Sequence, residues 1–319
     1  MTSPNGLWEH ALYSEPRVDH GFCTDDNARA MILLNGEREV TPTLSEASRI
    51  YVRFVRDAAL PAGGFHNRRR ADGSWADSVG SDDSQGRAIW ALGSMVHFGS
   101  ESSIREMGME LFLRQNFVSP SPRANAFAVL GASEILAADP THEHARNRIQ
   151  EWVAHIRVPE DSQWPWPESR LAYDNARIPE ALIAAGVALG IDSMIRDGLS
   201  LLDWLVGSET MDDHFSFTPA GGWAPGESRP GFDQQPVEAA AFADACDRAW
   251  EITGDSKWRD HVLRACRWFV GDNDRQVVLY DHETGAGYDG LTQGGANLNQ
   301  GAESTLAALS TLQKAAKYS

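Results

Sequence analysis

The chain has 319 residues, 42% of them hydrophobic, with a formal net charge of −17 at pH 7. Such a chain can bury roughly three quarters of its unfolded surface, and its acidity disfavours nucleic acids and anionic membranes as partners. No stretch approaches the roughly 20 apolar residues of a membrane span. The three cysteines lack metal-ligand spacing and the N-terminus has no signal-peptide pattern, so we predict a cytoplasmic protein with free structural thiols.

Two series of helices alternate along the chain. The first series is apolar nearly all round, which is typical of buried helices, and its members lie near 24–36, 83–98, 122–138, 174–190, 234–252 and 299–316. The second series carries charges on one face, and its members lie near 43–58, 102–115, 142–156, 192–206 and 256–270. Residues 5–13 could supply a short sixth member of the second series.

This alternation repeats about every 50 residues and predicts an all-α fold, an (α/α)6 toroid, in which the apolar helices form the inner wall. The main rival is an open solenoid of helical pairs. All-round apolar inner helices favour the closed ring. Because no Ser/Gly tract, Pro run or charge block interrupts the pattern, we predict one domain over residues 1–319.

A short repeat marks the starts of the inner helices. Asp26-Asn27-Ala28-Arg29 recurs as Asp174-Asn175-Ala176-Arg177, with a looser copy at Asp83-Ser84-Gln85-Gly86-Arg87. The arginine that ends each copy lies in a buried wall near a positive helix end and needs a carboxylate partner. The repeat therefore predicts an ion-paired polar layer, whose role is structural, is to orient catalytic carboxylates, or is to bind an anionic substrate.

Two later inner helices carry a carboxylate at the corresponding place, Glu238 and Glu303. An unpaired glutamate in an apolar wall has a raised pKa and suits a general acid. The alternative is that both pair with the arginines of the repeat.

Four long connections, 59–82, 157–173, 207–233 and 271–298, precede inner helices, and we expect them on one side of the fold. Long loops in a compact domain are usually functional. They combine aromatic residues and glycine turns with single carboxylates. Flat apolar rings and a few oriented polar groups suit sugars; the alternative is that the aromatic residues only pack the loops down.

Three stretches carry a resemblance: His20 to Ala30, Trp164 to Glu180, and Asp289-Gly290-Leu291 with Asn297 to Ser304. The chain resembles an uncharacterised bacterial family of six-hairpin, glycosidase-like domains, often found attached to or beside glycosyltransferases. The resemblance implies an (α/α)6 fold and a carbohydrate context, and it supplies no reaction. Pro167 stands where a bulky residue is expected before Glu168, which puts the shape of that loop in doubt.

We predict a carbohydrate-active enzyme, foremost an inverting glycoside hydrolase that uses two carboxylates on oligosaccharides or glycan chain ends. The predicted pool of acid and base is Asp26, Asp83, Glu168, Asp174, Glu238 and Glu303. The predicted substrate-binding and orienting residues are Asp25, Arg29, His66, Trp75, Arg87, Trp164, Trp166, Tyr173, Asn175, Arg177, Trp223, Gln234, Gln235, Tyr288, Asp289, Asn299 and Gln300.

Other functions stay open: a non-catalytic sugar-binding or scaffold module, a sugar epimerase or lyase, and a terpene-cyclase-like enzyme, which Asp72-Gly73-Ser74-Trp75 faintly suggests. No cofactor motif is present, and Asp25-Asp26 lacks the ligand spacing of a calcium loop, so we predict no cofactor and no metal. The expected partner is an oligosaccharide or glycoconjugate, without nucleic acid or membrane. The oligomeric state is open.

Overall fold

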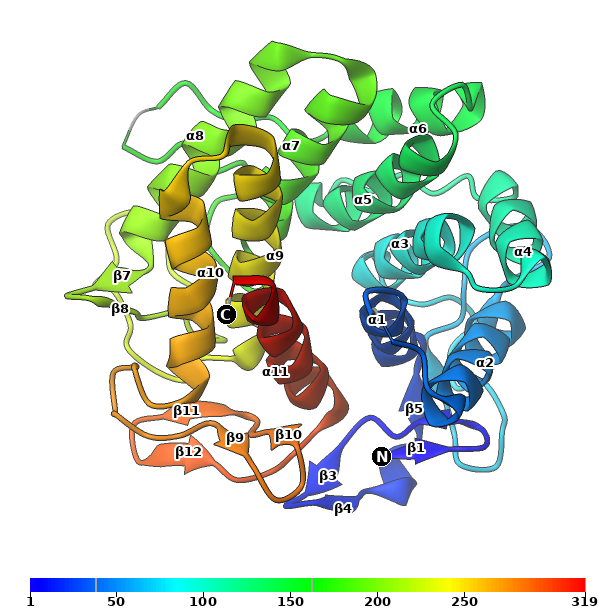
Figure 1. The fold of residues 1–319 in the computed structure, drawn as a ribbon, viewed down its shortest axis with the longest axis horizontal. Helices are drawn as coiled ribbons and strands as arrows, with labels where there is room; N and C mark the ends of the chain where they lie inside the picture. The colour runs from blue at the N-terminus through cyan, green and yellow to red at the C-terminus, as the bar shows by residue number, and fades with distance from the viewer. Residues whose placement is uncertain (38, 162, 319) are drawn as a thin grey trace. The chain divides into compact units, whose positions relative to one another are not determined.

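The computed structural model describes residues 1–37, 39–161 and 163–318. Buried and amphipathic helices alternate along it (Figure 1). The buried helices are α1 (Thr24–Asn35), α3 (Asp82–Phe98), α5 (Pro122–Ala138), α7 (Arg177–Leu189), α9 (Pro236–Thr253) and α11 (Ala302–Ala315). The amphipathic helices are α2 (Pro42–Ala58), α4 (Ser102–Leu113), α6 (Glu143–Val153), α8 (Asp192–Ser208) and α10 (Ser256–Phe269). The two predicted series are thus confirmed.

The expected short helix at 5–13 is wrong. The N-terminal strands are β1 (Thr2–Ser3), β2 (Gly6–Leu7), β3 (Ala11–Leu12), β4 (Glu15–Pro16) and β5 (Phe22–Cys23), with a 3-10 turn at Val18–His20. Pro4-Asn5 forms the turn between the paired strands β1 and β2, and Gly6 has φ +138°, which a helix does not allow. The later strands are β6 (Arg68–Arg69), β7 (Thr210–Met211), β8 (His214–Phe215), β9 (Tyr280–Asp281), β10 (Ala286–Gly287), β11 (Gly290–Thr292) and β12 (Gly295–Asn297). A final 3-10 turn is Ala316–Tyr318.

Three inner helices begin later than the sequence suggests. Asp174 has φ +52°, so the chain enters α7 only at Arg177. α9 begins at Pro236, a residue suited to the first helical turn because it lacks the free N–H. α11 begins at Ala302 rather than 299.

The chain divides into two compact units. The first comprises Met1–Ala11, Glu15–Ile156 and Ala184–Ile191, and the second comprises Leu12–Ser14, Arg157–Ile183 and Asp192–Ser319. A single domain over residues 1–319 stays a prediction.

In the first unit α3 packs between α1 and α5, while α2, α4 and α6 pack on α1, α3 and α5 in turn (Figure 1). The closest approach is between α3 and α5. A Cβ at Gly93 would lie 1.9 Å from the carbonyl oxygen of Gly131, and one at Gly131 would lie 2.5 Å from that of Ile89. Glycine at both positions therefore lets the two backbones touch.

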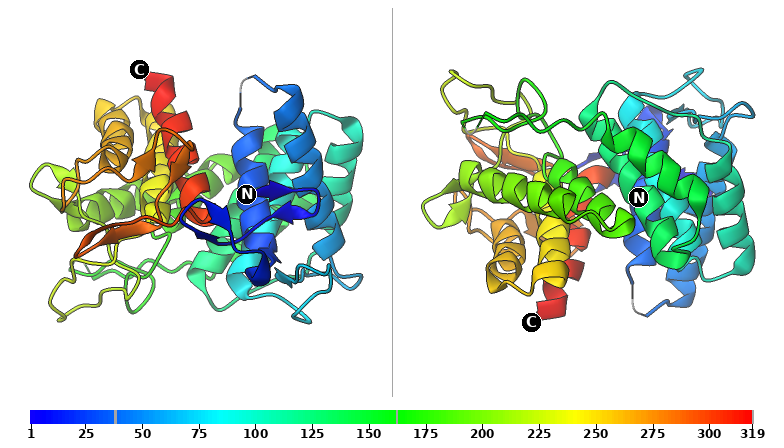
Figure 2. Two further views of the ribbon diagram at one scale, coloured as in Figure 1. Left: turned by 90° about the horizontal axis from the view of Figure 1, so that it is seen from below. Right: turned by 90° about the horizontal axis from the view of Figure 1, so that it is seen from above.

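In the second unit α9 packs against both α10 and α11, the yellow to red helices of Figure 2. In both units the long loops lie at the starts of inner helices. Strand β6 of loop 59–81 pairs with β5, directly before α1. Leu171, before α7, bridges to Trp223, and Gln234, before α9, bridges to Leu291.

Candidate functional site

An ion-paired layer surrounds the start of α1 in the first unit. Asp25 Oδ1 accepts a hydrogen bond from Arg87 Nε at 2.7 Å, and Asp25 Oδ2 lies 3.4 Å from Arg29 Nη2. Arg29 Nη1 also lies 3.7 Å from Asp26 Oδ1. Arg87 is 1% exposed, and its guanidinium carbon lies 3.9 Å from the centre of the Phe127 ring. The carboxylate partners predicted for these two arginines are present.

Cys23 caps α1 beside this layer. Its thiol donates to Asp26 Oδ2 at 3.1 Å and accepts from the Asp26 N–H at 3.4 Å. Burial, followed by the charge of Asp26, raises the pKa of Cys23 well above its usual range, so the sulfur stays a protonated thiol. Glu9, Cys23 and Asp26 bring ligand-type atoms within 4.8 Å of one another, but Glu9 is bonded to Arg68. A protonated thiol and a paired carboxylate suit a metal ion poorly.

His66 lies at the same helix start. Its carbonyl oxygen accepts a bond from Thr24 Oγ1 at 2.7 Å, and the side chain of the next residue, Asn67, accepts the Asp25 N–H at 3.2 Å. Its ring stacks on Trp75 with centroids 4.9 Å apart and planes 11° apart. Because Arg69 also lies 5.4 Å from the Trp75 centroid, Trp75 supports His66 more than it offers a free sugar platform.

The amide in each copy of the repeat anchors the preceding chain. Asn27 accepts the Leu7 N–H at 3.0 Å and donates to the Cys23 carbonyl at 2.8 Å. Gln85 accepts from and donates to the backbone of Phe65, at 2.8 and 2.7 Å. Asn175, which is fully buried, accepts the Ala172 N–H at 3.0 Å. The repeat thus has a backbone-anchoring role besides its ion pairs.

In the second unit Arg177 gathers three carboxylates. Its guanidinium lies 3.1 Å from Asp174, 2.8 Å from Glu180 and 2.7 Å from Asp244. Burial alone would lower the pKa of Arg177, but these carboxylates, Asp244 foremost, outweigh it and raise the pKa. The carboxylate partner predicted for Arg177 is therefore present three times over.

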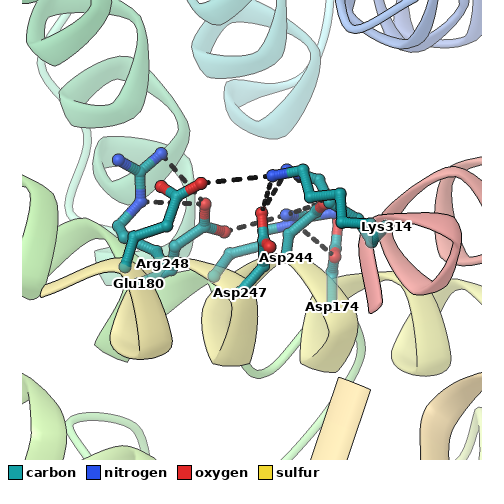
Figure 3. Close-up of polar contacts among 9 residues, drawn as sticks. Asp174, Glu180, Asp244, Asp247, Arg248 and Lys314 are labelled. Atoms are coloured by element: carbon teal, nitrogen blue, oxygen red, sulfur yellow. Dashed lines mark hydrogen bonds and ion pairs between the residues drawn. The ribbon is translucent and has the colours of Figure 1, made fainter. Parts of the chain in front are cut away.

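The network continues along α9 and α11 through residues that the sequence analysis missed. Lys314 Nζ lies 3.0 Å from Asp247 and 3.5 Å from Asp244, and Arg248 lies 3.3 Å from Glu180 (Figure 3). A signal was available, since each of these charges interrupts an otherwise apolar helix and must find a partner.

Glu238 is completely buried. Its oxygens accept the backbone N–H of Asp174 and, at 3.1 Å, that of Asn175. Burial, then the charges of Glu209 and Asp174, raises the pKa of Glu238 well above its usual range, as expected for a carboxyl in an apolar wall. With no exposed surface and with both oxygens bonded, it holds the start of α7 in place.

Two other predicted binding residues are also buried. Gln234 is 0% exposed and bonds to Phe217, Trp268, Gly231 and Asp274. Trp166 is 1% exposed and stacks on Trp204 with centroids 6.1 Å apart. Neither side chain offers surface to a sugar in this structure, and substrate contact by Gln234 and Trp166 stays a prediction.

Trp164 and Trp223 keep part of their surface exposed and meet edge-to-face with centroids 5.5 Å apart. Asn299 Oδ1 accepts the N–H of Tyr13, an exposed tyrosine, at 2.9 Å. Gln300, nearly buried, donates to Asp281 at 2.8 Å, and Asp289 accepts the Gly301 N–H at 2.8 Å. The remaining predicted residues are partly exposed, namely Asp83, Glu168, Tyr173, Gln235, Tyr288 and Glu303.

No protein-family model and no curated protein matches the chain. Among solved structures it is similar to a sugar epimerase from a ruminal bacterium, with 12% identity, a TM-score of 0.74, and coverage of 99% of this chain and 93% of that one. A D-mannose isomerase gives 13% identity, a TM-score of 0.71, and coverage of 100% and 93%. The GH76 α-mannanase of Bacteroides thetaiotaomicron is 13% identical, with a TM-score of 0.65 and coverage of 93% of this chain and 86% of that one.

These likenesses establish the fold. The chain has the six-hairpin, glycosidase-like (α/α)6 toroid fold, as predicted. Within the described residues, every helix is too short or too polar to cross a lipid bilayer.

Proposed function

We propose that this chain is an enzyme acting on carbohydrates, and that it moves a proton at a carbon of a sugar, as an epimerase or isomerase does. The likeness to a sugar epimerase and a D-mannose isomerase over 99% and 100% of the chain supports this class. At 12% and 13% identity, this likeness does not assign roles to individual residues of this chain. The choice of reaction therefore depends on the chain's own side chains.

The observation that favours proton transfer over hydrolysis is the position of the carboxyl groups. A glycoside hydrolase needs a protonated carboxyl and a second carboxylate, both in reach of the scissile bond. Glu180, Glu209 and Glu238 have raised pKa values, and none of these three carboxyls is more than 2% exposed. Asp26 and Asp174 are buried and pair with arginines. Hydrogen bonds and ion pairs inside the fold thus engage these five carboxyls.

An inverting glycoside hydrolase is the second candidate. Three predicted carboxyls keep part of their surface exposed. Asp83 lies in the first turn of α3, Glu168 in the loop before α7, and Glu303 in the first turn of α11. The likeness to an α-mannanase also favours it. On this alternative, two of these three carboxyls are acid and base.

One experiment separates the candidates. The protein is incubated in D2O with free aldoses, reducing disaccharides and aryl glycosides, and followed by proton NMR. Deuterium entering next to the carbonyl carbon, with a new epimer or ketose, would support the proposal. Release of sugar or aryl alcohol without such exchange would overturn it in favour of hydrolysis, and Glu168→Gln and Glu303→Gln would then locate the acid and base. Sugars that raise the melting temperature without turnover would indicate a binding module.

A further inference from the structure

We propose that His66, oriented by Asp77, is the base that removes the proton in this reaction. This inference rests on the proposed function. It assigns His66 a catalytic role, where the sequence analysis expected only substrate binding, and it makes Asp77 a positioning residue.

Hydrogen bonding fixes which nitrogen of His66 is available. Nδ1 lies 2.8 Å from the backbone carbonyl oxygen of Asp77. A carbonyl oxygen only accepts, so Nδ1 carries the hydrogen in the neutral ring and the lone pair is on Nε2. The described residues provide no hydrogen bond to Nε2, and 20% of the side chain is exposed. Nε2 is thus a free proton acceptor.

Asp77 prepares the ring for a positive charge. Its Oδ2 is held by the backbone N–H groups of Asn67 and Arg68, at 2.8 and 3.1 Å. Its Oδ1 lies 3.6 Å from His66 Nδ1, is buried, and has no hydrogen-bond partner in the described part of the chain. A carboxylate fixed at this distance stabilises the imidazolium that forms when Nε2 takes up a proton.

The ring is held in one plane beside the ion-paired layer at the start of α1. Trp75 stacks against it, 4.9 Å away. The adjacent bonds from Thr24 to the His66 carbonyl and from Asp25 to Asn67 tie this loop to the start of α1. These contacts fix where the ring stands relative to the start of α1.

The proposed step is balanced within the substrate and the imidazole. Nε2 forms a bond to the proton of the carbon next to the carbonyl of an open-chain sugar. The C–H electron pair becomes the C=C bond of an enediolate, and the carbonyl π pair moves onto oxygen, as in other proton abstractions next to a carbonyl. Return of the proton from the imidazolium to the former carbonyl carbon, while the neighbouring hydroxyl proton passes to the oxygen on that carbon, gives the ketose and restores neutral His66. Return to the original carbon, after the enediolate has turned its other face to Nε2, gives the epimer.

The test compares His66→Ala and Asp77→Asn with His97→Gln. His97 is a matched control, because its Nδ1 also meets a carboxylate, Glu134 at 2.7 Å, but at the last turn of α3. We expect His66→Ala to slow deuterium exchange at least about 100-fold, with part of the rate restored by added imidazole. We expect Asp77→Asn to lower kcat with KM unchanged, and His97→Gln to leave both as in the wild type.

A second readout does not depend on turnover. Nitrogen-15 NMR of the wild-type ring, assigned by the signals lost in His66→Ala, should show hydrogen on Nδ1 and not on Nε2 in the neutral form. Wild-type exchange that persists in His66→Ala, a rate that imidazole cannot restore, or hydrogen on Nε2 would each overturn the role of His66 alone. Absence of exchange in the wild type would overturn the proposed function together with this inference.

Discussion

At the scale of single residues, Glu209 has the clearest acid–base consequence. It is fully buried and accepts hydrogen bonds from the N–H and, at 2.6 Å, the hydroxyl of Thr218. Burial raises its pKa from 4.5 to about 7, although the bonds from Thr218 lower it. A group with a raised folded-state pKa contributes its full stabilisation below its unfolded pKa, and this is lost as the pH rises through the folded value.

We therefore expect Glu209→Gln, which resembles the protonated side chain, to remove a pH dependence between about 4.5 and 7. Near pH 5 the two proteins should have similar free energies of unfolding. At pH 8 the variant should be more stable by up to about 3 kcal/mol, since each unit of pKa shift corresponds to about 1.4 kcal/mol. Urea denaturation at several pH values measures this.

Glu106→Gln is the control, because Glu106 is exposed on α4 and the substitution changes the net charge equally. If the free energy of unfolding of Glu209→Gln ran parallel to that of the wild type at all pH values, the raised pKa of Glu209 would be contradicted. Subtracting the control removes the general repulsion in a chain of net charge −17.

Residue patterns predicted that Arg29, Arg87 and Arg177 have carboxylate partners, because a buried arginine must be neutralised. They did not predict which ones. Arg87 bonds to Asp25, 62 positions away, and Arg177 reaches Asp244 on another helix. Likewise, Asp77 stands in a loop with no motif, and only the path of that loop brings it to His66. Such pairings depend on how elements pack, which local spacing does not contain.

At the scale of elements, the spacing of apolar residues predicted the helices, because burial of a helix imposes that spacing. Each of the inner helices from α1 to α11 was located to within three residues of its start. The failures are short segments, where turn geometry decides: the strands before α1, and the left-handed Asp174 that delays α7. The close contact of α3 with α5 was not predicted either, since one glycine among alanines carries no distinct signal.

That contact supports a prediction. Alanine normally stabilises a helix relative to glycine by about 1 kcal/mol. At Gly93 the added methyl would lie 1.9 Å from a backbone oxygen of Gly131, and a helix backbone cannot yield without separating α3 from α5. We expect Gly93→Ala to lower the free energy of unfolding by roughly 3 kcal/mol or more.

Gly207→Ala is the matched control. Gly207 is exposed near the end of α8, and no atom lies within 4 Å of the added Cβ. This variant should gain up to about 1 kcal/mol. Equal effects of the two substitutions in urea denaturation would argue against a tight α3–α5 contact.

At the scale of the whole molecule, the question is whether the two compact units unfold together. Helix α7 is shared between them, with residues up to Ile183 in the second unit and from Ala184 in the first. Breaking a helix between adjacent residues leaves backbone groups without partners at both new ends. Because of this shared helix, we expect one cooperative unfolding transition, with equal calorimetric and van't Hoff enthalpies.

Two substitutions test this by acting in different units. Gly93→Ala acts in the first. In the second, a Cβ at Gly198 on α8 would lie 2.7 Å from the Ile183 side chain and 2.9 Å from its backbone nitrogen, so Gly198→Ala strains the packing of α8 on α7. In scanning calorimetry both variants should shift the same single peak downward. Two peaks, each moved by only one variant, would show that the units unfold separately and that α7 can break between Ile183 and Ala184. In that case the prediction of one domain would fail, although the fold of each unit would stand.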